Sequence, residues 1–105
     1  MKKLSIALLV IGCGILVTAC GQESAAQKAV LSGLKDPDSA KFGKSSFIKN
    51  AKGSSFACVT VNSKNSMGGY VGDKQALLME VKDSWTVFGF EDISHDQCLS
   101  IVAAM

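Results

Sequence analysis

The first nineteen residues constrain the fold most, because they decide how much of the chain is left to build a domain. Met1-Lys2-Lys3 is a short cationic start, and the mainly apolar run 4–17 follows it. A cationic start, an apolar stretch of this length and small residues behind it are the three parts of a secretory signal peptide. Gly12 and Gly14 interrupt the run, which is short for a transmembrane helix. We therefore expect residues 1–19 to be a cleaved signal peptide; the alternative is a retained N-terminal anchor.

The segment Leu16-Val17-Thr18-Ala19-Cys20 resembles the lipobox of bacterial lipoproteins. The resemblance implies that Cys20 is acylated (palmitate among the chains), becomes the first mature residue, and attaches the chain to a lipid bilayer. Cys13 fits the loose pattern too, but cleavage there would leave an apolar mature start. Stable attachment needs more than one acyl chain. We expect residues 20–24 to form a lipidated tether and residues 25–105 a single small domain.

Removal of the signal peptide changes the charge balance of the chain. Taking 19 from 105 residues leaves 86, and taking Lys2 and Lys3 from 11 basic residues leaves 9 against 9 acidic ones. A chain of this size has room for one domain. Without net positive charge or a basic stripe, nucleic-acid binding has little support.

Two cysteines, Cys58 and Cys98, remain in the expected domain. In an exported protein the simplest interpretation is one disulfide bond between them. The alternatives are a redox pair and half of a metal site, and neither has CxxC spacing or a neighbouring histidine cluster. We expect no metal and no cofactor.

The pattern of apolar residues predicts an α+β fold. Apolar residues at helical spacing indicate a helix over 24–35, and Asp36-Pro37 suits the N-cap and first position of a further turn. The expected strands are a short one around Phe47, then 56–62, 70–81 with an interruption near Gly72, and 85–90. We expect a three- or four-stranded antiparallel meander, with the N-terminal and C-terminal helices packed on one face.

The last segment has the clearest helix signal. Ser94 and Gln97 form a capping-box pattern, and an apolar stripe at helical spacing follows it. The stripe consists of Cys98, Ile101, Val102 and Met105. In the strand before it, Phe88 and Phe90 are two residues apart, so we expect them on the same face of the sheet.

The glycine-rich segment 62–72 is the most distinctive stretch, and it matches no phosphate-binding fingerprint. One interpretation is a hairpin connection whose glycines adopt positive φ and whose Asn65 makes a local side-chain bond. The other is a loop that contacts a partner through Lys64, Asn65 and Tyr70.

No catalytic set is recognisable. His95 is the only histidine, and its neighbour Ser94 is better used as a helix cap than as a nucleophile. The acidic residues Glu80, Glu91, Asp92 and Asp96 show no spacing that pairs two of them across a substrate. We expect no catalytic residues and no enzymatic activity.

The segment LKDPDSAKF (34–42), a cysteine-containing strand and then VNSKNSMGGYVG (61–72) resemble a recurring pattern. The pattern occurs in small exported proteins and lipoproteins of bacteria and prophages, mostly of unknown function, and covers roughly 34–78. It implies a shared small fold with the Gly-Gly-Tyr loop, and it implies no activity.

These observations predict a membrane-anchored, non-enzymatic periplasmic lipoprotein that binds an envelope protein, of the prophage superinfection-exclusion kind. The alternative is a small-ligand binder or enzyme that uses the 64–72 loop. Lipoproteins kept at the inner membrane often carry Asp after the lipidated cysteine, whereas this chain has Gly21. The expected location is therefore the outer membrane, with the domain facing the periplasm; inner membrane and cell surface are the alternatives.

Overall fold

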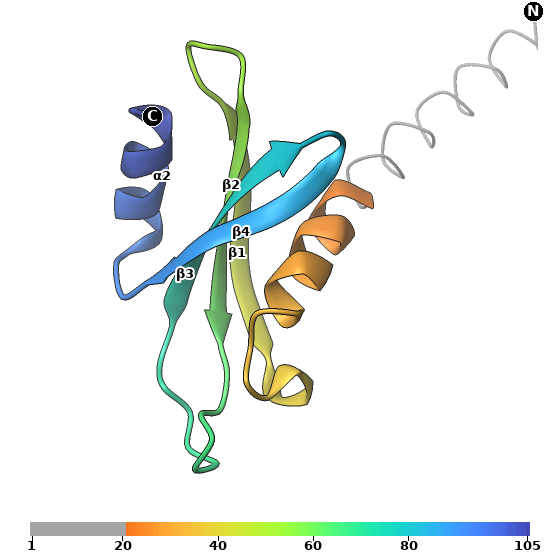
Figure 1. Cartoon of the computed structure of the whole chain (residues 1–105). Coiled ribbons are helices and arrows are strands. Elements are labelled where there is room, and N and C mark those ends of the chain that lie inside the picture. Colours follow the sequence, from red (N-terminus) through yellow and green to blue (C-terminus); the bar gives the residue numbers. More distant parts are fainter. Residues whose placement is uncertain (1–20) are drawn as a thin grey trace, which may run out of the picture.

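The computed structural model of the chain describes residues 21–105, so the expected signal peptide and Cys20 lie outside the described residues. An N-terminal helix, described over 21–31, leads into five labelled elements and a short turn (Figure 1). They are the 3-10 turn η1 (Pro37–Ser39), β1 (Lys41–Lys49), β2 (Ser55–Asn62), β3 (Lys74–Val81), β4 (Ser84–Glu91) and α2 (His95–Ala103). The expected α+β class is confirmed.

The four strands form one antiparallel sheet in the order β1-β2-β3-β4, which confirms the meander. β1 is longer than the short strand expected around Phe47 and pairs with β2 from Lys41 to Lys49. The composition of this segment does not indicate a strand of that length, because Gly, Ser and Lys are uncommon in strands. They are tolerated here since β1 is an edge strand with much of its surface in solvent. β3 is shorter than expected, because Gly72 has φ +92° and the strand begins only at Lys74.

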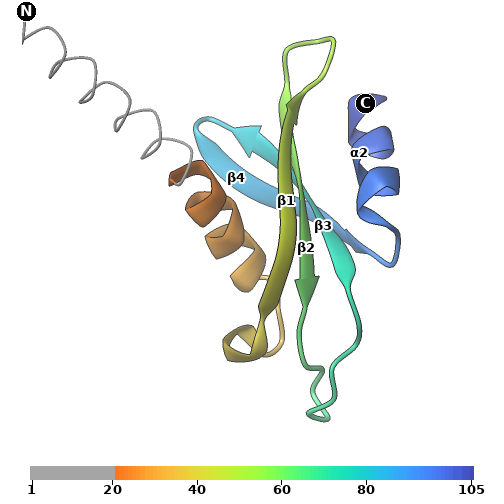
Figure 2. The same cartoon turned by 180° about the vertical axis from the view of Figure 1, so that it is seen from behind.

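The two helices cover opposite faces of the sheet, so the prediction that both pack on one face is wrong (Figures 1 and 2). One cluster joins Ala26 and Val30 of the N-terminal helix to buried residues of β2 and β3. The other joins Cys98 and Val102 of α2 to the alternate residues of the same strands. Central strands with apolar residues on both sides need a cover on each face, since successive side chains point in opposite directions.

The disulfide between Cys58 and Cys98 is confirmed, with an S–S distance of 2.02 Å. It links the middle of β2 to α2, and both residues are fully buried. The capping box is also confirmed. The Ser94 hydroxyl accepts from the backbone N–H of Gln97, and the Gln97 side chain accepts from the backbone N–H of Ser94. Only half of the predicted apolar stripe is buried, since Ile101 and Met105 remain 45% and 49% exposed.

Phe88 and Phe90 lie on opposite faces of the sheet, which corrects the expectation that they share one. The register of β4 against β3 shifts at this point, from Leu78↔Val87 to Leu77↔Gly89. Phe88 is the extra residue of this bulge, and a bulge reverses the alternation of side chains behind it. Phe88 therefore meets Phe56 on the α2 side, whereas Phe90 packs into the cluster under the N-terminal helix.

Two local features at the start of the domain also differ from expectation. The N-terminal helix, expected over 24–35, is described over 21–31 and so includes residues 21–24 of the expected tether. Asp36 occupies the N-cap position of η1 as predicted, but its side chain makes no capping hydrogen bond. Within residues 21–105, no helix has the length and the apolar character needed to cross a membrane.

Candidate functional site

The connection between β2 and β3, residues 63–73, projects from one end of the sheet, and we call it the distal loop. The described part of the N-terminal helix begins toward the opposite end of the domain, near the turn between β3 and β4 (Figures 1 and 2). The distal loop contains all three residues that the sequence nominated for partner contact, Lys64, Asn65 and Tyr70.

Asn65 builds the turn at the tip of the distal loop. Its side-chain oxygen accepts from the backbone N–H groups of Met67 at 2.9 Å and Gly69 at 3.2 Å. Its own N–H donates to the carbonyl of Gly69, and its carbonyl accepts from Gly68, which has φ +84°. A non-glycine residue is strained at that φ. The predicted local Asn65 bond is confirmed, and so is a positive φ at Gly68 and Gly72, whereas Gly69 has no positive φ.

The base of the distal loop is tied to the sheet and to η1. Lys64 and Tyr70 face each other in an isolated antiparallel bridge. The backbone N–H of Lys64 donates to the Ser39 hydroxyl at 2.8 Å, and that of Gly72 donates to the Asn62 side chain at 3.0 Å. These bonds connect the loop to the sheet and to η1, although its residues are mostly exposed.

Tyr70 stands at the centre of a small cationic patch. Its hydroxyl donates to the carbonyl of Ser39 at 3.1 Å, which fixes the ring. The ammonium groups of Lys41 and Lys64 lie 4.5 Å and 5.5 Å from the ring centroid, within the range of cation–π attraction. The structure thus brings Lys64 and Tyr70 together, whereas the Asn65 side chain is occupied within the turn.

Apolar side chains at the tip and at the base of the distal loop complete the surface. Met67 is 92% exposed, and Tyr70 and Val71 are more than 40% exposed. Sequence analysis missed Met67, although its place after Asn-Ser in the turn is a signal that it points outward. Two surface hollows formed within residues 21–105 contain no residue of the distal loop. The loop is therefore a protruding surface with exposed apolar side chains.

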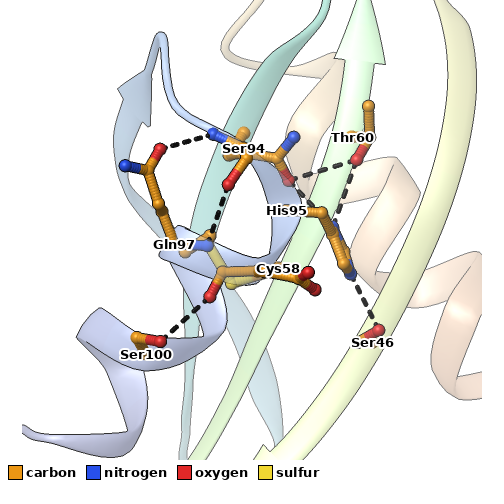
Figure 3. The surroundings of a disulfide bond; sticks show 10 residues. Ser46, Cys58, Thr60, Ser94, His95, Gln97 and Ser100 are labelled. Carbon is orange, nitrogen blue, oxygen red and sulfur yellow. Dashed lines mark hydrogen bonds between the residues drawn. A yellow bond between two sulfur atoms is a disulfide. The ribbon is translucent and has the colours of Figure 1, made fainter.

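A second polar cluster surrounds His95 at the start of α2 (Figure 3). Its Nδ1 lies 2.9 Å from the buried Gln75 Oε1, and its Nε2 lies 2.8 Å from the Ser46 hydroxyl. The Thr60 hydroxyl, 3.2 Å from Nδ1, donates to Gln75 Oε1. Because an amide oxygen only accepts, Nδ1 carries the proton and Nε2 accepts from Ser46.

Burial lowers the pKa of His95 below its ordinary value, the positive charge of Lys44 acts in the same direction, and Asp96 opposes both. The neutral ring is therefore favoured near neutral pH, in agreement with the hydrogen-bond pattern. The Ser46 hydroxyl bonds to a neutral imidazole, and the Gln75 amide oxygen bonds to the other nitrogen of that ring. This connectivity is similar to the one that activates a serine nucleophile. Here the three groups come from β1, β3 and α2, and neither described hollow borders them.

We interpret the His95 cluster as an anchor that joins the start of α2 to three strands. Sequence analysis missed Ser46 and Gln75 as partners of His95, because 49 and 20 residues separate them from it and no motif marks them. Within residues 21–105, no group of three or more His, Cys, Asp or Glu residues is placed to hold a metal ion.

Comparison of the chain with protein-family models, with curated proteins and with solved structures gave no match.

Proposed function

We propose that this chain is a membrane-anchored, non-enzymatic binding protein of the cell envelope. In this proposal, lipid on Cys20 holds the domain at the outer membrane, facing the periplasm, and the distal loop contacts an envelope protein. The observation that carries the proposal is the distal loop, a hydrogen-bonded frame that presents an exposed apolar tip.

The position of the loop supports this role. A lipid on Cys20 would stand directly before Gly21, whereas the distal loop projects from the other end of the sheet (Figure 1). An attached domain would then present the loop away from the bilayer surface. Tethering also raises the effective concentration of the domain toward a partner in the same compartment.

The chemistry of the loop supports a protein partner. Because the Asn65 turn is already ordered, binding would cost little further loop entropy. Met67 supplies a flexible apolar side chain suited to a pocket, and the Lys41–Tyr70–Lys64 patch supplies a cationic rim. An apolar centre with a polar rim is the usual arrangement of protein interfaces. A superinfection-exclusion role, in which the loop blocks an envelope receptor, is the specific form we propose.

Photo-crosslinking in cells tests the binding claim. A photoreactive amino acid at Met67 should capture a discrete envelope protein, and the same amino acid at Lys52, in the turn at the other end of the sheet, should not. Equal capture at both positions, or none at Met67 in protein that folds normally, would contradict the role of the distal loop.

The anchoring claim is tested separately. Cys20→Ala should abolish fatty-acid labelling and release the protein from membranes, while the domain still folds. Labelling that persists in this variant would move the lipid to another residue, and fractionation with the inner membrane would contradict the proposed location.

A further inference from the structure

We propose that the outer edge of β4, together with the N-terminal helix, is a second binding site, for an extended uncharged peptide segment. The segment would add to the sheet as a fifth strand, beside β4. This inference goes beyond the proposed function, because it concerns neither the distal loop nor the lipid anchor.

Among residues 21–105, the hydrogen-bond pattern of β4 leaves backbone groups without a strand partner at its outer edge. β4 is the last strand of the sheet, and a two-residue turn at Lys82 and Asp83, both with positive φ, joins it to β3. In such a turn the flanking residues, Val81 and Ser84, exchange hydrogen bonds. Bonded and non-bonded pairs then alternate, so the N–H and C=O groups of Trp85 and Val87 point away from β3.

A hollow lies beside these two residues. It has a volume of about 350 Å³ and is lined by Ala29, Ser32, Gly33, Trp85, Thr86 and Val87. The side chains of Trp85 and Val87 face the N-terminal helix, and that of Thr86 points to the other face, so the hollow reaches the backbone edge of β4. Small residues on the helix side leave this space open.

Charge identifies the occupant as an uncharged strand. No charged side chain lines the hollow, and none lies between Ser84 and Phe90 of β4. The outer edge of β1 is different, since it carries Lys41, Lys44, Lys49 and a bulge, features that protect edge strands from pairing. An extended peptide satisfies the free backbone groups of Trp85 and Val87 and places a small apolar side chain in the hollow.

The test uses the purified full chain and the capped peptide acetyl-(Ser-Val)4-amide at millimolar concentration. The peptide should slow amide hydrogen exchange of Trp85 and Val87, while Thr86, already bonded to β3, should change little. Trp85 is the only tryptophan of the chain, so its fluorescence emission reports occupation of the hollow directly. A peptide with every second amide N-methylated should have no effect.

A matched pair of variants locates the site. Ser32→Leu fills the hollow and should weaken peptide binding about tenfold. Ser24→Leu, at an exposed serine of the helix that precedes Ser32 and outside the hollow, should not. Unchanged exchange of Trp85 and Val87 with peptide would overturn the proposal. If exchange of these two amides slows without peptide as the protein concentration rises, the occupant is a second copy of the chain, and the proposed peptide occupant is wrong.

Discussion

Two turns at opposite ends of the sheet have the same construction and different surroundings. One is residues 50–54, between β1 and β2, which we call the proximal turn, and the other is residues 65–69 in the distal loop. In each, the Asn side-chain oxygen accepts from the backbone N–H groups two and four residues later. In each, the glycine three residues after the Asn has φ +84° and donates to the Asn carbonyl.

The difference between the turns lies in what surrounds this shared frame. The proximal turn follows directly on paired strands, and its Asn50 amide also donates to the carbonyl of Met105 at 2.9 Å. The distal turn stands on a longer connection, and its third residue is the exposed Met67 where the proximal turn has Lys52. The Asn and Gly positions determine the turn, so the positions between them are free to carry function. The distal turn places the large, exposed Met67 there, where the proximal turn has Ala51 and Lys52.

The largest loss of stability should come from removing the disulfide bond, which constrains the strand that connects both turns. β2 connects them, and the disulfide from Cys58 to Cys98 holds β2 to α2. The double variant Cys58→Ala/Cys98→Ala should lose about 4 kcal/mol of unfolding free energy, from the freed 40-residue loop of the unfolded chain. Urea unfolding with and without reductant measures this. Thiols that react in the untreated native protein would contradict the assignment.

The next effect separates the two turns. Asn65→Ala removes two side-chain hydrogen bonds and should cost about 1 to 2 kcal/mol. Asn50→Ala should cost more, because it also removes the bond to Met105. Urea unfolding of the two variants under the same conditions gives the comparison.

Aspartate provides the control for these asparagines. Asn65→Asp keeps the accepting oxygen and should be close to neutral. Asn50→Asp also keeps the accepting oxygen of the turn, but it replaces the donor to Met105 with an oxygen that repels that carbonyl. Equal losses for Asn50→Ala and Asn65→Ala would mean that the contact with the C-terminal carbonyl contributes nothing.

Much of the fold was predictable because local chemistry decides it. The capping box at Ser94 and the β-branched and aromatic run of β2 specify their elements within a few residues. What depends on distant partners was not predictable. The bulge that turns Phe88 away from Phe90 arises from the pairing of β4 with β3, and the placement of the helices on opposite faces arises from strands buried on both sides.

The candidate site divides in the same way. The positive-φ glycine and the local role of Asn65 follow from residue chemistry, and sequence analysis identified both. The contact of Tyr70 with Lys41 and Ser39, and the bonds of His95 to Ser46 and Gln75, join residues that are close only in the folded chain. No spacing rule brings such pairs together.

A smaller effect tests whether the two turns share one backbone. Gly53→Ala and Gly68→Ala should each cost about 1 kcal/mol, since both glycines have φ +84° and a Cβ on either would meet nothing within 4 Å. The two losses in urea unfolding should be equal. Gly69→Ala, at a residue without positive φ, is the control and should be nearly neutral. Unequal losses would show that the turns differ in flexibility despite their matching hydrogen bonds.

The smallest effect concerns pH and should act on the distal end alone. Thr60 and Gln75, near the ends of β2 and β3 that carry the distal loop, bond to His95. Within residues 21–105, no histidine bonds to the proximal turn. Because burial, reinforced by Lys44, lowers the pKa of His95 in the folded protein, the unfolded chain binds the proton more readily. The contribution of His95 to stability is therefore present above the unfolded pKa of about 6.5. It is lost as the pH falls through the lower pKa of the folded protein.

Hydrogen exchange at pH 7.5 and pH 5 should therefore show the amides of Thr60 and Gln75 opening more readily at the lower pH, after correction for the intrinsic exchange rate. The amides of the proximal turn should change less. In His95→Gln, which cannot titrate, the difference between the two ends should disappear. If the difference in exchange between the two ends persists in this variant, another group causes the pH response. If exchange in the wild-type protein changes equally at both ends, His95 stabilises the whole domain rather than the base of the distal loop.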